Sequence, residues 1–366
     1  MQPIFNQINK NEEMEINYKQ LIFAREYRKY TQTELASHIT GLSQSNLSKF
    51  EKGLGTLSGD IVQKIISFLD FPEKFFKKRI SNRVDNAHYR KKSAITKATR
   101  LDIEYSNKVI GFIIDQMTRS VEWPEFTLKP IDIEDGFSPK TIAKYIRKQM
   151  GLLDDEPVKN IFNHLESNGI IVVEFDTTEK FDGVSFLTDK GNPVIVINRS
   201  FSNDRKRFTL SHELGHVIMH IAGNFIIPDY RNVENEANDF ASEFLMPAEQ
   251  IKNSFRKLKL SDLAEHKIYW LTSMASIIRS AKDNGSISID RYKYLNIELS
   301  RKWGRKNEPV KVFIDEPKSF QTAYKMHKND LEYSDSELAE AFGLPVDVLN
   351  RFCNFPKGNS KLRVLI

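Results

Sequence analysis

Apolar residues recur at helical spacing over the first 80 residues of the chain. A helix is expected to begin near Asn17. The next segments, TQTELASHI and SQSNLSKFEKG, each open with Thr or Ser, whose side-chain oxygen satisfies free N–H groups at a helix start. Gly41 separates them and Gly53 ends the second, which indicates two short helices joined by a tight turn. With the amphipathic stretch SGDIVQKIISFLDF after them, residues 15–76 predict an all-α domain.

The middle of the chain changes from a helical to a strand pattern. SPKTIAKYIRKQMG predicts a helix capped by Ser138, whereas GIIVVEFD, GVSFLTD and NPVIVINRS are β-branched or aromatic runs bounded by Gly, Asp and Asn. The sequence LTDKGNPVI places a turn between the last two runs. We therefore expect a small antiparallel sheet that precedes two helices.

The C-terminal third is helical again, with a cap expected at Ser261 or Asp262. Within it, YSDSELAEAFGLPVDVLNRF repeats the pattern of the first helix pair: Glu-Leu-Ala, a Gly-Leu turn, and a second short helix that ends in Phe. This second pair is acidic, so a packing or protein-contact role is favoured over DNA binding.

Composition narrows the class of protein. With 366 residues, the chain is long enough for two or three globular domains. Its 40% hydrophobic side chains exclude a wholly disordered or collagen-like protein. It has a single cysteine, Cys353, no apolar signal-peptide core near its start and no run of 18 apolar residues. These features predict a cytoplasmic protein without a membrane partner.

The net charge of +5 is distributed unevenly. Residues 77–100 contain nine Lys or Arg and one acid, Asp85. Two interpretations remain open: a solvated linker, or a segment that faces DNA phosphates beside the helical domain.

The strongest chemical signal is the segment RFTLSHELGHVIMH. His212 and His216 are four residues apart and lie on one face of a helix, so that both can bind one metal ion. Glu213 lies between them, where its carboxylate can accept a proton from water and later pass it to a leaving amine. This is the HExxH arrangement of zinc hydrolases.

A catalytic zinc ion needs a third protein ligand. Glu234 and Glu236 compete for this role in NVENEANDFASEFLMP. Glu234 lies three and seven residues before Ala237 and Ala241, on the apolar face of the helix, whereas Glu236 points nearer the flank, so we favour Glu234.

Two further residues are candidates for the surroundings of the metal ligands. Asn238 lies one turn after Glu234 and either hydrogen-bonds His212 or His216 or faces solvent. His220 continues the histidine series by one turn; a position packed under a loop is favoured over one at the site.

These segments together resemble the ImmA/IrrE family of metallo-endopeptidases fused to an N-terminal Xre-type helix-turn-helix. The resemblance is carried by RFTLSHELGH, ENEANDFASEFLMP, LSRKWGRKNEP and HYRKKS for the peptidase, and by TQTELASHITGLSQSNLSKFEKG for the helix-turn-helix. It implies a zinc site formed by His212, His216 and Glu234. The expected fold is multidomain and mainly α, with a helix-turn-helix over 15–76, a basic linker over 77–105, an α+β zincin-like domain over 106–256 and a mostly helical C-terminal region over 257–366.

The resemblance to Xre-type domains also implies the residues that contact DNA. Gln and Asn pair with adenine edges, while Ser and Lys more often hold phosphates. We therefore expect base contacts from Gln44, Ser45 and Asn46, and backbone contacts from Gln32, Ser48 and Lys49. Glu51 is expected to be structural. The alternative, a helix-turn-helix used only for dimerisation or protein contact, stays open.

The predicted protein is a DNA-binding transcriptional regulator with a zinc-dependent endopeptidase domain that acts on a repressor-type or operon-encoded protein, held as an extended strand along GVSFL or PVIVI. The alternative is an antitoxin or repressor of a toxin-antitoxin operon, in which the zincin domain binds or senses rather than cleaves. The expected partners are double-stranded operator DNA and a protein substrate or toxin encoded nearby. A homodimer is compatible with paired half-sites.

Overall fold

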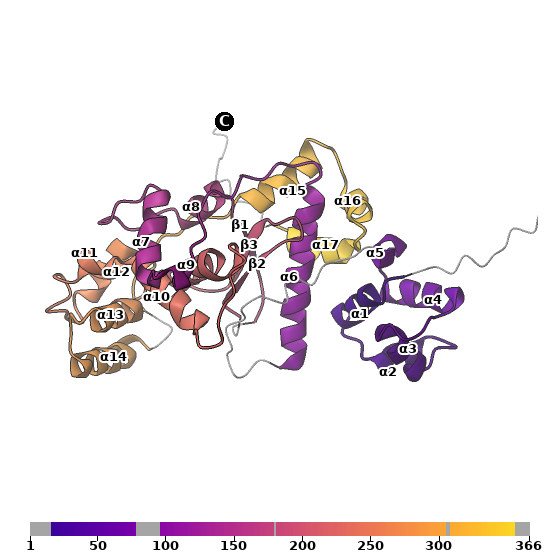
Figure 1. Cartoon of the computed structure of the whole chain (residues 1–366), viewed down its shortest axis with the longest axis horizontal. Coiled ribbons are helices and arrows are strands. Elements are labelled where there is room, and N and C mark those ends of the chain that lie inside the picture. Colours follow the sequence, from indigo (N-terminus) through magenta and orange to yellow (C-terminus); the bar gives the residue numbers. More distant parts are fainter. Residues whose placement is uncertain (1–15, 78–95, 179–180, 305–307, 356–366) are drawn as a thin grey trace, which may run out of the picture. The chain divides into compact units, whose positions relative to one another are not determined.

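The structure is a computed structural model that describes residues 16–77, 96–178, 181–304 and 308–355 (Figure 1). Most of the basic segment 77–100, including HYRKKS, lies outside the described residues. The contacts among the described residues divide the chain into two units. One contains the chain up to Lys77, residues 96–113 and the chain from Tyr324 onward; the other contains residues 114–323. These limits differ from the domain limits expected above, because the helix α6 continues through the end of the expected linker and the C-terminal region divides between the two units.

The first unit begins with five helices: α1 (Tyr18–Tyr27), α2 (Gln32–His38), α3 (Gln44–Glu51), α4 (Gly59–Leu69) and α5 (Glu73–Lys77). The side chains of Asn17, Thr31 and Ser43 accept hydrogen bonds from backbone N–H groups at the starts of α1, α2 and α3, as the capping pattern predicts. Their core is apolar: Leu21, Leu35, Leu47, Ile65 and Phe75 are fully buried.

A buried ion pair fixes α3 against α1. Arg25 Nε and Nη2 donate to the two carboxylate oxygens of Glu51 at 2.6 and 2.8 Å. Both side chains are less than a tenth exposed, so the loss of either partner would leave a buried charge without its counterpart. The expected structural role of Glu51 is confirmed.

The rest of the first unit consists of part of α6 (Lys97–Met117), part of α15 (Ser319–Asn329), α16 (Asp335–Phe342) and α17 (Val346–Cys353). The last two form the second helix-turn-helix shape, in which Gly343, with φ of 70°, ends α16. Asp347 at the start of α17 accepts two hydrogen bonds from Arg28, at 2.5 and 3.2 Å, and Arg351 donates to Asp102 at 2.9 Å. Both an acidic and a basic residue of α17 thus have oppositely charged partners within the same unit.

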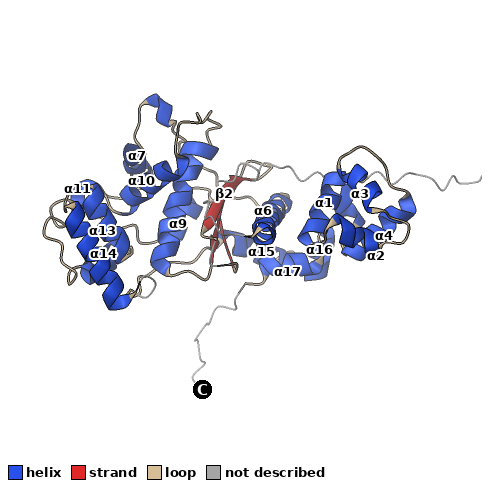
Figure 2. Cartoon of the chain, turned by 90° about the horizontal axis from the view of Figure 1, so that it is seen from below, coloured by secondary structure: helices blue, strands red, loops and turns tan. Residues whose placement is uncertain are grey.

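The second unit combines a small sheet with helices (Figure 2). Its remaining elements are η2 (Ile133–Asp135), α7 (Pro139–Gln149), α8 (Ile161–Ser167), β1 (Ile171–Phe175), β2 (Gly183–Leu187), β3 (Pro193–Asn198), α9 (Asn203–His216), η3 (Val217–Ile221), α10 (Val233–Leu245), α11 (Ala248–Ile251), α12 (Leu263–Trp270), α13 (Met274–Asp283) and α14 (Ile289–Trp303). The predicted cap Ser138 accepts a hydrogen bond at the start of α7.

The sheet is mixed, which corrects the expected antiparallel sheet. Within the described residues its order is β1-β3-β2; β2 and β3 form the predicted hairpin, whereas β1 pairs with β3 in parallel. The strand pattern specifies the strands and the tight turn, but not which strand lies beside which. The central position of β3 also corrects the expectation that PVIVI offers an edge to a substrate, because both edges of this strand are already paired.

The helix α9 packs on one face of this sheet (Figure 2). The register places Val172, Ser185 and Ile195 side by side across the three strands, and Gly183 beside Ile197. Gly183 lies under α9: a Cβ atom at this position would be 2.6 Å from the Thr209 side chain. This close approach brings β2 alongside the HExxH helix.

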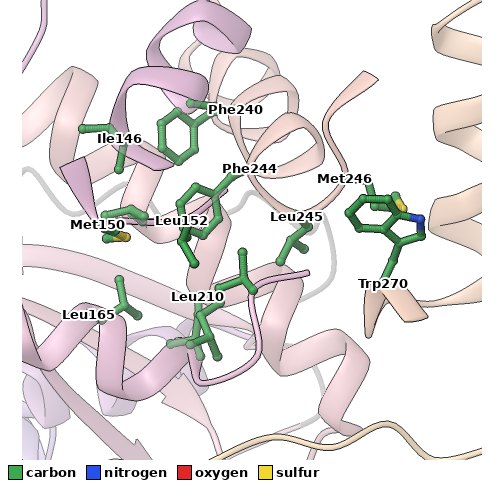
Figure 3. Packing of buried hydrophobic residues seen from close by; sticks show 14 of the residues in the cluster. Ile146, Met150, Leu152, Leu165, Leu210, Phe240, Phe244, Leu245, Met246 and Trp270 are labelled. Atoms are coloured by element: carbon green, nitrogen blue, oxygen red, sulfur yellow. The ribbon is translucent and has the colours of Figure 1, made fainter. Parts of the chain in front are cut away.

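The core of the second unit lies where α7, α9, α10 and the helices up to α14 meet. Figure 3 shows Phe240 and Phe244 of α10 packed near Ile146 and Leu152, with Leu245 and Met246 toward Trp270. Arg147, fully buried on α7, donates to the carbonyl oxygen of Phe244 at 2.7 Å and so ties α7 to the end of α10. Among the helices of the described ranges, none combines the length and apolarity needed to cross a membrane.

Candidate metal centre

The close contact between α9 and α10 positions the candidate site. Gly215 lies between the two histidines, and a Cβ atom there would be 3.1 Å from Cδ1 and 3.2 Å from Cγ of Phe240. Such distances are tighter than most Cβ contacts in proteins, so a larger residue here would require Phe240 to move by a few tenths of an ångström. The approach brings the beginning of α10 to the histidine face of α9.

Gly215→Ala is therefore expected to be about 1–3 kcal/mol less favourable for stability than Gly59→Ala, because crowding against Phe240 opposes the helix propensity that alanine adds at both positions. The measurement is thermal or urea unfolding of the full chain. Gly59→Ala is the control, because Gly59 has a helical φ and open space around its Cβ position. Equal stability of the two variants would contradict the close-packing argument.

Three side chains converge at this contact. His212 Nε2 lies 3.6 Å from Glu234 Oε2, His216 Nε2 lies 3.5 Å from Glu234 Oε1, and the two Nε2 atoms are 3.1 Å apart. Each residue offers one ligand atom, and these atoms lie within 4.8 Å of one another. Both imidazoles are buried, while Glu234 keeps a third of its side chain exposed. Burial by itself would raise the pKa of Glu234, but the two imidazoles beside it hold the pKa well below its usual range.

The comparisons with known proteins agree with this arrangement. Residues 166–267 match the peptidase M78 family described as the IrrE N-terminal-like domain, and residues 22–76 match the helix-turn-helix family. The chain carries a helix-turn-helix domain and an IrrE-like peptidase domain. The former implies DNA binding and the latter a protein substrate.

The comparison with curated proteins finds a similar stretch in "Uncharacterized immunity region protein 2" of Bacillus phage phi105. The two are 38% identical over 85 residues, which cover 21% of this chain and 52% of the phage protein. The chain thus spans about half the length of this relative. No solved structure is significantly similar to the chain.

Glu213, the carboxylate between the two histidines in the sequence, is held by a residue that the sequence analysis did not single out. Ser185 on β2 donates its hydroxyl hydrogen to Glu213 Oε2 at 2.7 Å, and both residues are buried. Thr209 and Glu213 are one turn apart on α9, and Gly183 and Ser185 are two residues apart on β2, which are similar distances along the two elements. Gly183 therefore lies against Thr209 while Ser185 reaches Glu213. The available signal was a hydroxyl residue inside the apolar run GVSFL.

Of the two interpretations of Asn238, the structure has the hydrogen-bonded one: its Oδ1 atom is 3.1 Å from His212 Nδ1. His220 Nδ1 is 3.0 Å from His216 Nδ1, so His220 lies beside a candidate ligand, which corrects the favoured position under a loop. Glu236, the rival of Glu234 in the sequence, instead lies 2.8 Å from His220 Nε2 and is bound by Arg231. Hydrogen bonds from these neighbours lower the pKa of Glu236, although its burial would raise it.

In the helix-turn-helix domain, the residues expected to contact DNA lie on the start of α2 and along α3. Gln44, Ser45, Asn46 and Lys49 are exposed, and Gln32 and Ser48 are half-buried. Gln32 donates to Glu51 at 2.7 Å, and Gln44 donates to the side-chain oxygen of Gln32 at 2.9 Å. Hydrogen bonds thus connect the buried Arg25–Glu51 ion pair, through Gln32, to Gln44 at the exposed start of α3.

Proposed function

We propose that the protein is a DNA-binding regulator whose IrrE-like domain is a zinc-dependent endopeptidase for a repressor-type or operon-encoded protein. The observation that carries this proposal is the convergence of His212, His216 and Glu234 beside Glu213. Because operator DNA is the expected first partner, we place its action in the cytoplasm.

The donor set suits zinc. Two imidazole nitrogens and a carboxylate oxygen are the ligands of many catalytic zinc sites, and three protein ligands leave a position for water or substrate. The low pKa of Glu234 keeps this carboxylate charged, as metal binding requires. When bound, zinc would polarise a substrate carbonyl group and make water more acidic.

Glu213 is the proposed general base. It is buried next to His212, and Ser185 binds its Oε2 atom, which restricts the rotation of the carboxylate. In the proposed reaction, Glu213 accepts the proton of the water that attacks the scissile carbonyl carbon. It then donates this proton to the amine nitrogen as the peptide bond breaks.

The substrate is proposed to bind as an extended segment along β2. This strand pairs with β3 on one side and lies alongside α9, next to the general base, through Ser185. Main-chain hydrogen bonds to an edge strand give affinity with little side-chain selectivity. The central strand β3 cannot bind a substrate strand in this way, because it already pairs with β1 and β2.

For the helix-turn-helix domain, we propose that α3 enters the major groove. Gln44, Ser45 and Asn46 would then contact base edges, and Gln32, Ser48 and Lys49 the backbone. The hydrogen bond from Gln44 to Gln32, which is itself bound to buried Glu51, fixes Gln44 before DNA arrives. A homodimer on paired half-sites is part of this proposal.

Gln44→Ala is expected to weaken binding to DNA of the protein's own promoter by about 1–3 kcal/mol, or roughly 5- to 150-fold, because it removes a base contact. The measurement is a mobility-shift titration at constant salt. Asp239→Asn, an exposed change in the other domain, is the control. If wild type and Gln44→Ala bind alike, α3 does not read bases at this position.

The regulatory alternative is an antitoxin or repressor in which the zinc site only binds or senses. The name of the phage relative, an immunity region protein, supports a role in the control of a mobile element and is compatible with either form. Co-expression with the product of the adjacent gene separates them. Cleavage that depends on Glu213 supports the endopeptidase, whereas growth rescue without cleavage, in wild type and Glu213→Gln alike, supports the antitoxin.

A further inference from the structure

The two carboxylates at the beginning of α10 have different surroundings. Glu234 faces the Nε2 atoms of the two candidate ligands, whereas Glu236 faces a second layer. Arg231 Nε donates to Glu236 Oε1 at 3.0 Å, and Arg231 Nη2 donates to Oε2 at 2.8 Å. The Arg231 side chain is only 3% exposed, and a guanidinium is always charged. Both oxygens of Glu236 are therefore fixed as acceptors.

The same Glu236 Oε2 atom lies 2.8 Å from His220 Nε2. His220 belongs to the π-helical turn after His216, in which Ala222 N–H donates to the carbonyl oxygen of Val217 at 2.9 Å. Its side chain is fully buried, and its Nδ1 lies 3.0 Å from His216 Nδ1. Glu236, His220 and His216 thus form a continuous chain of hydrogen-bonding atoms.

Only one placement of the ring hydrogens of His216 and His220 leaves His216 able to bind a metal. His216 turns Nε2 toward Glu234 and His212, so this nitrogen needs a free lone pair and the ring hydrogen must be on Nδ1. His216 Nδ1 then donates to His220 Nδ1, and His220 carries its hydrogen on Nε2. An ionised carboxylate only accepts hydrogen bonds, so Glu236 is the partner that this order requires.

We propose that Glu236, acting through His220, holds His216 in the tautomer whose Nε2 lone pair faces the metal centre. This inference rests on the proposed zinc site, and it makes His220 and Glu236 positioning residues. The two ligand histidines are then fixed differently: His212 directly by the side-chain oxygen of Asn238, and His216 through three successive hydrogen bonds that end at Arg231.

The first test is Glu236→Gln. Arg231 offers donors to both side-chain atoms at this position, so an amide must turn its NH2 group toward a donor of Arg231 or of His220. With the NH2 group toward His220, His220 Nε2 must accept, which allows the opposite order, in which His216 carries its hydrogen on Nε2. With the NH2 group toward Arg231 Nε, the amide oxygen still accepts from His220 Nε2, but it is neutral and therefore holds this hydrogen less strongly than the carboxylate. We expect zinc affinity to fall about 10- to 100-fold, the usual effect of removing such an outer partner. It is measured on the full chain by competition with a chromogenic chelator.

Asp239→Asn is the matched control, since it makes the same chemical change at an exposed position of the same helix and should leave zinc affinity unchanged. His212→Ala distinguishes a failure of this inference from a failure of the proposed zinc site. If His212→Ala loses zinc while Glu236→Gln binds it like wild type, the inference is wrong and the zinc site stands. If His212→Ala also retains zinc, the proposed site itself is wrong.

A second measurement does not depend on a variant that folds. Nitrogen NMR of the zinc-loaded full chain, labelled only at its 8 histidines, distinguishes the two tautomers of each imidazole. We expect the His220 hydrogen on Nε2 and the His216 hydrogen on Nδ1. A His220 hydrogen on Nδ1 would overturn the proposal, whatever the stability of Glu236→Gln.

Discussion

Glu213→Gln is expected to lower peptide-bond hydrolysis about 10²- to 10⁴-fold while zinc stays bound. The amide has nearly the shape of the carboxylate and can still accept the hydrogen bond from Ser185, so the packing of α9 on β2 should persist. What it lacks is the ability to accept a proton from water. Since Glu213 is not among the three converging ligand residues, metal content should not change.

The assay incubates the zinc-loaded full chain with the purified product of the adjacent gene and follows fragments by mass spectrometry. Zinc content and circular dichroism of the variant are measured in parallel. Asp239→Asn is again the control for the loss of an acidic side chain from this domain. Full activity of Glu213→Gln would eliminate Glu213 as the general base.

His212→Ala is expected to remove zinc from the protein. His212 is one of the three proposed ligands among the described residues, and the change also removes the partner of Asn238. Metal analysis after dialysis should find about one zinc per wild-type chain, as for a single catalytic site, and almost none in the variant. Hydrolysis should disappear with the metal.

Ligand binding provides a second measurement of the same change. Free zinc at about 100 times its dissociation constant should stabilise the wild-type fold by about 2.7 kcal/mol, because the metal binds the folded state. His212→Ala should show no such gain. His38→Ala, an exposed histidine in the helix-turn-helix domain, is the control. Zinc-dependent stabilisation that survives in His212→Ala would place the metal elsewhere.

The local features of both domains were accessible from the sequence because neighbouring residues decide them. Caps such as Thr31, Ser43 and Ser138 lie within three residues of the N–H groups they bind. The four-residue spacing of His212 and His216 fixes a common face on any helix. The face argument for Glu234 needed only the apolar positions of its own helix, and the structure places Glu234 opposite both imidazoles.

Features that join distant segments were not accessible in this way. The three strands were recognised, but the pattern of apolar residues does not specify which strand pairs with which. The structure places β3 between β1 and β2. Ser185 carried no recognisable signal beyond being polar in an apolar strand, because its partner Glu213 belongs to another element. The sequence pattern treated 257–366 as one separate region, and only the contacts show that α16 and α17 group with the helix-turn-helix domain whereas α12, α13 and α14 group with the peptidase domain.

The sequence by itself thus determined the helices, the hairpin, the HExxH face and the two domain types, since short-range periodicity, capping and spacing specify them. Only the tertiary structure decided which hydroxyl holds Glu213 and how Glu236 reaches His216. Those contacts depend on how closely α9, α10 and β2 pack, and this closeness is set by small residues such as Gly183 and Gly215 together with a core drawn from many segments.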